Sequence, residues 1–506
     1  MSGAPEHVDV LIIGAGISGI GAGAQLGMRL PDKKYAILEA REVSGGTWDL
    51  FKYPGIRSDS DMFTFGYKWE PWPSDQSLAD GHKILDYLRT VAKKYDVEDK
   101  IRYLHKVVKT SWSSDDKRWT VTVETPEGLT TLTADFLWCC SGYYDYDRGH
   151  APDFPGREDF EGTFIYPQFW PEDLDYTGKK VVVIGSGATA VTLVPAMADK
   201  VDHITMLQRT PTYVFSRPGR DPLARGLAKA LGLVPGFVPL RGLREKASFE
   251  VLRWANIGVL VGSYQFARRS PKRMRKIIRD GVIDHLTARD GQPGLTREEA
   301  VAYADTHFNP PYDPWDQRLC AVPDGDLFRA IREGKASVVT DHIKTFVKDG
   351  IELESGKKLE ADIVVSATGL KVQLFGGIPV EVDGKPVDVS ESMAFKGALL
   401  TGVPNFAFTI GYTNASWTLK VDLVSEYVAN LLAEMEERGH RVVRVERDPS
   451  IPAKPLMELA SGYIQRAQSE MPRKGDRAPW DAKQNYLVDM RVLGADPRKD
   501  EELQFD

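Results

Sequence analysis

Val8-Asp9-Val10-Leu11-Ile12-Ile13-Gly14-Ala15-Gly16-Ile17-Ser18-Gly19 decides the fold of the first part of this chain. The apolar run before Gly14 is typical of a buried parallel strand, and an alanine-rich helical stretch follows it. A second apolar run, Tyr35-Ala36-Ile37-Leu38, ends at Glu39, which lies at roughly the 20-residue distance expected of the acid in a dinucleotide fingerprint. The stretch therefore predicts a β-α-β unit that binds a dinucleotide.

Each residue type in this fingerprint has a physical role. Gly14, Gly16 and Gly19 allow backbone N–H groups to approach a pyrophosphate at the start of the helix, where Ser18 also lies. The carboxylate of Glu39 would accept hydrogen bonds from ribose hydroxyls. This first site suits FAD.

A second fingerprint lies further along the chain, after the apolar run 181–184. It reads Gly185-Ser186-Gly187-Ala188-Thr189-Ala190. The following strand, 203–207, leads to Arg209 and Thr210 in place of an acid. A guanidinium can bind the 2′-phosphate of NADPH, which a carboxylate would repel, so the second site suits NADPH. By itself, Arg209 could equally be a solvated arginine at a strand end.

Two similar segments are predicted to be strands that close these units. They are Ala134-Asp135-Phe136-Leu137-Trp138-Cys139-Cys140-Ser141-Gly142 and Ala361-Asp362-Ile363-Val364-Val365-Ser366-Ala367-Thr368-Gly369. The expected fold is therefore α/β, with two Rossmann-like dinucleotide-binding domains and a helical insertion. We expect FAD-binding parts at 1–145 and 389–506, NADPH-binding parts at 146–212 and 315–388, and the insertion at 213–314.

Composition excludes several other classes of protein. The 506 residues carry 65 Lys and Arg against 72 Asp and Glu, a net charge of −7, which gives no overall footprint for nucleic acid. The 3 cysteines form no C-x-x-C pair, so neither a disulfide framework nor a metal site is predicted, and a reducing cytoplasm is the expected location. The N-terminus shows no secretion signal, and no membrane-spanning stretch is predicted.

A basic run lies on a predicted helix of the insertion: Arg268-Arg269-Ser270-Pro271-Lys272-Arg273-Met274-Arg275-Lys276. Such a run usually forms a solvated helix face. Contact with a membrane surface or an anionic partner is the less favoured interpretation. The oligomeric state is not indicated by any motif.

The residues after Glu39 indicate a family. They read Gly45-Gly46-Thr47-Trp48 and then Tyr53-Pro54-Gly55-Ile56-Arg57-Ser58-Asp59. Together with Phe160-Glu161-Gly162 and Trp170-Pro171, they resemble type I Baeyer–Villiger monooxygenases, a branch of the flavin-containing monooxygenases. The resemblance covers essentially the whole chain. Through 45–50, 316–320 and 411–420 it is most similar to the bacterial ethionamide-activating monooxygenases.

The family's F-x-G-x-x-x-H-x-x-x-W-P signature is present with one departure. Phe160, Gly162, Trp170 and Pro171 match, but Tyr166 occupies the histidine position. In the family this segment is a linker into the NADPH domain, where the histidine supports domain movement. The departure therefore puts in doubt the coupling of NADPH binding to oxygenation more than the reaction class.

The resemblance implies a reaction. NADPH reduces FAD, the reduced flavin adds O2 at its C4a carbon, and the resulting peroxide inserts an oxygen next to a ketone carbonyl, giving an ester or lactone. Sulfides or thioamides would be oxidised as a second activity. The family's catalytic arginine matches Arg318, and Asp59 would hold it by an ionic hydrogen bond. Asp59 could alternatively belong to a helix N-cap cluster, Ser58-Asp59-Ser60-Asp61.

The resemblance also assigns further cofactor contacts. For FAD these are Gly46, Thr47, Trp48, Asp59 and Val107. For NADPH they are Arg57 and Ser58, besides the second fingerprint. Relatives that carry lysine before the catalytic arginine use it on the NADPH phosphate; Gln317 stands here, which leaves Arg209 as the main selecting cation.

Three other functions remain open from the sequence. An N- or S-oxygenating flavin monooxygenase without ester formation shares both fingerprints, although Trp170-Pro171 and Arg318 favour the Baeyer–Villiger branch. A disulfide reductase shares the layout, but the adjacent Cys139-Cys140 pair does not suit its chemistry. A flavin-binding redox sensor without turnover would use the basic run as its interface.

Overall fold

The first sheet is built around the first fingerprint. The computed structural model describes residues 5–230, 243–288, 291 and 293–506. The parallel strands of this sheet lie in the order β3 (Ile101–Arg102), β2 (Tyr35–Leu38), β1 (Glu6–Ile13), β6 (Gly128–Cys139) and β21 (Phe406–Phe408). The first predicted strand, helix and second strand are all present, and α1 (Ile17–Arg29) begins within the fingerprint.

Both faces of this sheet are covered, which explains the unbroken apolar run in β1. Val10 and Ile12 pack in one core with α1, α4 (Gly81–Lys94) and α11 (Trp417–Arg438). Leu11 and Ile13 pack in a second core with the neighbouring antiparallel strands. The start of α1 is thereby held at the carboxyl end of a rigid sheet.

An antiparallel extension completes the first sheet. β4 (Lys106–Ser113) and β5 (Arg118–Thr125) form a meander with β6, and β17 (Val380–Val382) pairs with β4 and with β18 (Lys385–Pro386). The chain has thus rejoined the first sheet before residue 389, where the sequence placed the boundary. The expected boundary at residue 389 is therefore wrong. A strand this short forms through its backbone pairing with β4, and its sequence carries no motif that would reveal it.

The second sheet is built around the second fingerprint. Its strands are all parallel, in the order β12 (Ala336–Thr340), β9 (His203–Gln208), β8 (Lys180–Ile184), β16 (Ile363–Ser366) and β7 (Thr163–Ile165). α5 (Ala188–Met197) and α10 (Asp326–Arg332) pack on one face. The hairpin strands β13 (Ile343–Val347), β14 (Gly350–Leu353) and β15 (Lys358–Glu360) cover the other. The predicted α/β fold with two dinucleotide-binding units is therefore confirmed.

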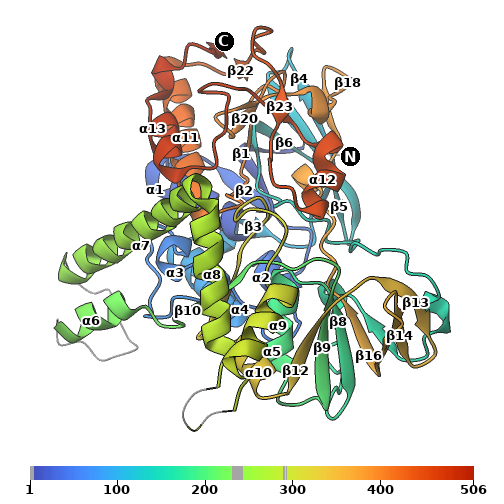
Figure 1. Cartoon of the computed structure of the whole chain (residues 1–506). Helices are drawn as coiled ribbons and strands as arrows, with labels where there is room; N and C mark the ends of the chain where they lie inside the picture. The colour runs from blue at the N-terminus through green and yellow to red at the C-terminus, as the bar shows by residue number, and fades with distance from the viewer. Residues whose placement is uncertain (1–4, 231–242, 289–290, 292) are drawn as a thin grey trace.

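The insertion contains more than helices. It begins with β10 (Val214–Arg217), which pairs in parallel with β11 (Cys320–Pro323) across the base of the insertion. Its helices are α6 (Pro222–Ala230), α7 (Leu243–Arg269), α8 (Pro271–Leu286) and α9 (Arg297–His307). Figure 1 shows α7 and α6 extending away from the two sheets. Among the described residues, no helix is long and apolar enough to cross a membrane.

The C-terminal part packs on the first sheet. Its elements are β19 (Ala394–Phe395), β20 (Leu399–Leu400), α11, β22 (Val443–Val445), β23 (Lys454–Pro455), α12 (Gly462–Ala467), β24 (Arg473–Lys474), α13 (Tyr486–Leu493) and β25 (Leu503–Phe505). Two buried ion pairs fix this region, Lys396 with Asp500 at 2.6 Å and Lys420 with Asp489 at 2.8 Å. In Figure 1 α11 lies beside α1 and α13 beside α11, which places the C-terminal helices next to the first helix of the chain.

The first glycine of each fingerprint meets the end of a neighbouring strand. A Cβ on Gly14 would lie 2.8 Å from the carbonyl oxygen of Cys140, just after β6. A Cβ on Gly185 would lie still closer to the carbonyl oxygen of Ala367, just after β16. Both glycines also have positive φ, +99° and +133°. The two Ala-Asp strand segments therefore close the two units in the same way.

We expect Gly185→Ala to destabilise the protein by about 3 kcal/mol or more, because the methyl group adds a backbone clash to the strain of a positive φ. Gly178 is the matched control, since it also has a positive φ, +66°, but nothing within 4 Å of its Cβ position. Gly178→Ala should cost only about 1–2 kcal/mol. Thermal or urea unfolding of both variants measures the difference, and equal losses would show that the close approach carries no stability.

Candidate active site

One cavity of about 490 Å³ lies where the carboxyl ends of the two sheets face each other. It receives Gly14, Gly16, Ser18 and Glu39 from the first unit and Ala188 and Thr189 from the second. Most of the other predicted contacts also line it: Gly46, Thr47, Trp48, Arg57, Ser58, Asp59, Val107 and Arg318. Residues from both predicted nucleotide units thus meet in a single cavity.

The first fingerprint is arranged as a dinucleotide site requires. Glu39 lies at the end of β2, and its two carboxylate oxygens accept hydrogen bonds from the backbone N–H of Ala15 at 2.8 Å and of Arg41 at 3.0 Å. Burial raises the pKa of Glu39 above its usual range, although these two hydrogen bonds oppose the shift. Gly19 does not line the cavity; a Cβ there would collide with the Gly14 carbonyl, so Gly19 serves the tight turn.

The Gly45–Trp48 loop forms the opposite wall of this cradle. A Cβ on Gly46 would lie 3.1 Å from the Cα of Gly16, so two bare backbones face each other across the floor. Gly46 is followed by α2 (Thr47–Leu50), and the ring of Trp48 packs edge-on against Phe65 in α3 (Met62–Phe65). Side chains in place of these glycines would fill the space between the two backbones. The open space fits the pyrophosphate of a bound FAD.

Arg318 and Asp59 meet in this cavity. The guanidinium of Arg318 donates one hydrogen bond, from Nη2 to Oδ1 of Asp59, at 2.7 Å. The side chains are 33% and 18% exposed. The Asp59 carboxylate raises the pKa of Arg318 further, so the guanidinium is charged at every accessible pH. The other oxygen of Asp59, Oδ2, is buried without a hydrogen-bond partner among the described residues.

Asp61, and not Asp59, is the helix cap in this cluster. Asp61 is the N-cap of α3, where its Oδ1 accepts hydrogen bonds from the backbone N–H of Phe63 at 2.8 Å and of Thr64 at 3.3 Å. The Ser58 hydroxyl donates to the carbonyl oxygen of Ser60. Asp61 therefore caps the helix, and the carboxylate of Asp59 binds Arg318 instead.

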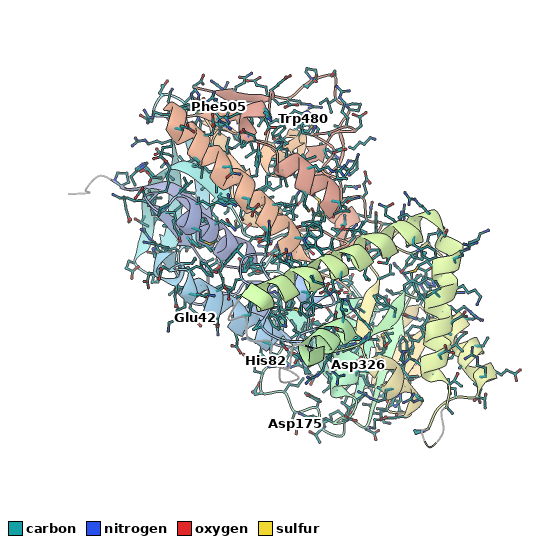
Figure 2. The ribbon with its side chains drawn as sticks, turned by 90° about the vertical axis from the view of Figure 1, so that its left-hand side faces the viewer. Glu42, His82, Asp175, Asp326, Trp480 and Phe505 are labelled. Carbon is teal, nitrogen blue, oxygen red and sulfur yellow. The ribbon has the colours of Figure 1, made fainter. Side chains whose placement is uncertain are left out.

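Arg57 lines the same cavity but is held differently. Its guanidinium binds Asp326 through two nitrogens, Nη1 at 2.5 Å and Nη2 at 3.3 Å. Asp326 begins α10 and is labelled in Figure 2. The pair links the loop before α3 to the second unit, so much of the hydrogen-bonding capacity expected to serve NADPH is already used by the protein.

The second fingerprint is only partly exposed to the cavity. Ala188 and Thr189 line it, whereas Gly185, Ser186, Gly187, Arg209 and Thr210 do not. The Ser186 hydroxyl is instead 2.7 Å from that of Thr212. Arg209 is exposed at the end of β9, and no ion pair or hydrogen bond of its side chain is found among the described residues. Its guanidinium is therefore available to an anion outside the cavity.

Comparison with known proteins identifies the family. The chain is 50% identical over 502 residues to the FAD-containing monooxygenase EthA of Mycobacterium tuberculosis (strain ATCC 25618 / H37Rv), covering 99% of this chain and 98% of EthA. The chain belongs to the EthA-type FAD-containing monooxygenases. It is also 47% identical over 508 residues to the putative FAD-containing monooxygenase MymA of the same strain, with 99% and 98% covered.

Family models and solved structures agree with this family. A flavin-binding monooxygenase-like model matches residues 57–224, and an NAD(P)-binding Rossmann-like model matches residues 12–74. An open cyclohexanone monooxygenase structure aligns with a TM-score of 0.72 at 18% identity, over 99% of this chain and 100% of that one. An oxidised steroid monooxygenase bound to NADP aligns with a TM-score of 0.72 at 20% identity, over 99% of both chains. The protein is a flavin monooxygenase, and the expected cofactors FAD and NADPH agree with these relatives.

In this family member the linker signature packs against the second sheet. Phe160 is buried, and a Cβ on Gly162 would lie 2.5 Å from the carbonyl oxygen of Asp362, just before β16. Trp170 is buried as well, whereas Pro171 is exposed. The signature thus fixes the edge strand β7 of the second sheet.

Tyr166 lies at the end of β7. Its ring packs edge-on against Phe164, with centroids 5.4 Å apart. It also lines a small void of about 20 Å³ together with Thr189 of the second fingerprint. The position expected to carry the family histidine is therefore next to the nucleotide unit, and whether it couples the domains stays a prediction.

Sequence reasoning missed several aromatic residues of this cavity, among them Tyr143, Tyr144 and Trp417. Tyr143 and Tyr144 follow the first closing strand, and their hydroxyl oxygens are 2.6 Å apart. Trp417 stacks on Tyr143 with ring centroids 5.0 Å apart, and its Nε1 donates to the Ser18 hydroxyl. Trp417 lies in the 411–420 stretch that carried the family resemblance, which was the only signal available for it.

For the first fingerprint, we expect Glu39→Gln to weaken FAD binding by about 10- to 100-fold, because one charged acceptor is lost from a buried site. Glu42→Gln is the control, since Glu42 is exposed a few residues away and is labelled in Figure 2. Titration of the apoprotein with FAD, followed by flavin fluorescence, measures both affinities. Equal affinity in the two variants would remove Glu39 from the binding site.

Proposed function

We propose that the protein is a Baeyer–Villiger monooxygenase. It converts a ketone, O2, NADPH and a proton into an ester or lactone, NADP⁺ and water. The observation that supports this reaction most directly is the permanently charged Arg318, held by Asp59 in the cavity lined by the first fingerprint. Ester or lactone formation and the use of NADPH are more specific than membership of the flavin monooxygenase family.

Arg318 has the properties of a stabiliser of negative charge. Bound FAD would supply activated oxygen, and attack on a ketone carbonyl then places negative charge on oxygen. Asp59 uses one hydrogen bond of the guanidinium, and the described residues accept no other from it, so its remaining N–H groups can serve the reacting oxygens. In a partly dehydrated site such a fixed cation stabilises the charged transition state strongly.

Asp59 acts through Arg318 and is a positioning residue. Its Oδ1 holds the guanidinium, while its loop is fixed by the adjacent N-cap of α3. A carboxylate this close also offsets part of the cost of keeping a charged arginine away from water. The cation is thus kept in one place before substrate arrives.

The two nucleotides would be held by different parts of the chain. The glycine cradle, Glu39, Thr47, Trp48 and Val107 line the part of the cavity suited to FAD. Ala188 and Thr189 would hold the pyrophosphate of NADPH at the start of α5. Arg209, exposed and unpaired among the described residues, would bind the 2′-phosphate, and Arg57 and Ser58 complete the wall between the two.

A second activity, oxidation of sulfides or thioamides, is favoured by the tyrosine pair. Sulfur needs a protonated, electrophilic oxidant, in contrast to a ketone. Tyr143 and Tyr144 line the cavity, and burial raises the pKa of both hydroxyls above the usual range, so both remain proton donors at neutral pH. The same cavity can therefore favour either protonation state of the oxidant.

The proposal is tested by products. FAD-loaded protein is incubated in air with NADPH and a panel of linear, cyclic and aryl ketones and sulfides, and products one oxygen heavier are sought. Esters or lactones support the proposal. S-oxides or N-oxides without any ester would assign the protein to the N- or S-oxygenating class. NADPH consumption that no substrate stimulates would favour the redox sensor.

Arg318→Ala should separate the two half-reactions. The variant should bind FAD and accept hydride from NADPH, because the glycine fingerprints are untouched, but ester formation should fall by about 10²–10³. Arg220→Ala is the control, because Arg220 pairs with Asp75 outside the cavity. Stopped-flow flavin bleaching is measured beside ester yield. Near-normal ester formation in Arg318→Ala would end the catalytic assignment.

Arg209→Ala should remove most of a preference for NADPH over NADH. Loss of one bidentate phosphate contact costs about 1.5–3 kcal/mol, or roughly 10- to 150-fold in affinity. Lys200→Ala, an exposed cation before the start of β9 and so at the opposite edge of the sheet, should leave the preference unchanged. Flavin reduction is titrated with each coenzyme. If Arg209→Ala weakened NADH and NADPH equally, its guanidinium would not contact the phosphate.

A further inference from the structure

The long helix α7 exposes large apolar side chains on its outer side and buries two polar ones on its inner side. Its buried side carries Arg253 and Asn256, which are 2% and 6% exposed, beside the apolar side chains of Phe249, Leu252 and Ile257. Its outer side carries Val251, Trp254 and Val259, which are 58%, 47% and 64% exposed. The outer side of a surface helix in a water-soluble protein normally carries polar and charged side chains instead.

The polar side chains anchor α7 in this orientation. Arg253 donates hydrogen bonds to the carbonyl oxygens of Phe63 at 3.3 Å and Gly66 at 2.8 Å, and to Asp422 at 3.1 Å. The amide nitrogen of Asn256 donates to a carboxylate oxygen of Asp221 at 3.2 Å. Rotating the helix to hide its apolar side would leave these buried groups without partners, which is costly. The apolar side is therefore fixed outward.

The outer side is open and continuous along the helix. Val251, Trp254, Gly258, Gly262 and Phe266 recur at intervals of three or four residues, so they share one side. Nothing described lies within 4 Å of the Cβ positions of Gly258 and Gly262. Figure 2 shows α7 crossing the side of the molecule turned to the viewer. The sequence 251–269 contains no acidic residue.

This side continues into the basic run. Arg269 lies on the same side of α7 as Gly262 and Phe266, and Lys272 and Arg273 follow in the first turn of α8. All three cations are exposed, and none has an ion-pair partner among the described residues. Other members of the run are paired within the protein, such as Arg268 with Asp316 at 2.7 Å. In a chain of net charge −7, these unpaired cations form a local positive end to an apolar strip.

We propose that the outer side of α7 and the start of α8 form a docking surface for a membrane leaflet that contains anionic lipid. Val251, Trp254, Val259 and Phe266 enter the boundary between headgroups and acyl chains, and Arg269, with the adjoining cations, binds the lipid phosphates. Both parts are required by this chemistry, since apolar insertion and charge attraction each give only weak binding by themselves. The helix lies on the membrane and does not cross it.

A second copy of the chain fits this surface less well. In either orientation a second copy of the strip offers the unpaired cations no acidic residue, because 251–269 contains none. An anionic leaflet meets both the apolar and the positive part. The proposal is independent of the reaction proposed for the cavity, because none of these residues lines it.

The test is flotation of the FAD-loaded, full-length protein with vesicles. One set is pure phosphatidylcholine and the other is phosphatidylcholine mixed with phosphatidylglycerol. The protein should float with the mixed vesicles and be released from them by salt. Trp254→Ser combined with Val259→Ser should lower the partition coefficient at least about tenfold. Reversal of Arg269, Lys272 and Arg273 to Glu should lower it by a similar factor and abolish the preference for mixed vesicles.

Matched controls separate docking from a general change of surface. Leu129→Ser removes an apolar side chain that is 74% exposed on β6, and Lys34→Glu with Lys100→Glu reverses two exposed cations elsewhere. These controls should float like the parent protein. Failure of the parent to bind mixed vesicles at low salt overturns the proposal. An unchanged partition coefficient of the Trp254 and Val259 variant overturns the proposal as well. If light scattering then shows a lower mass for this variant, the surface is assigned to a second copy of the chain.

Discussion

The ion pair between Arg318 and Asp59 joins two parts of the chain that are 259 residues apart. Asp59 belongs to the loop that leads from the first unit into α3, and Arg318 lies two residues before β11, just after the insertion. Neither element closes the cavity alone. The contact therefore sets the location of a positive charge within the cavity by joining residues from both ends of the insertion's path.

Two arginines of the cavity differ in how completely the protein uses them. Arg57 binds Asp326 through two nitrogens and ties the first unit to α10 of the second. Arg318 gives Asp59 only one hydrogen bond. A bidentate pair is directional and largely satisfied, whereas a single contact leaves a planar cation with free donors. The first arginine thus suits a structural link, and the second suits a group that appears only during reaction.

The sequence was sufficient where consecutive residues dictate a local structure. The glycines near Gly14 and Gly185, and the acid Glu39, could be predicted because one turn, one helix and one strand end dictate them. The return of β17 to the first sheet could not be predicted, because this strand of three residues is defined only by its backbone pairing with β4. The same holds for the partner of Arg57, because Asp326 is distant in sequence and has no motif. Trp417 and the tyrosine pair were missed because aromatic residues are more often core than cavity wall.

The short helix α3 connects the loop that carries Asp59 to the insertion. Its N-cap, Asp61, is two positions from Asp59, and its carbonyl oxygen at Phe63 accepts a hydrogen bond from Arg253 of α7. The Thr64 hydroxyl, 2.6 Å from that of Ser416, ties the same turn to the start of α11. A helix of one turn has little stability of its own, so these three attachments hold it. Because α7 is one of them, the insertion is joined through this turn to the loop that carries Asp59.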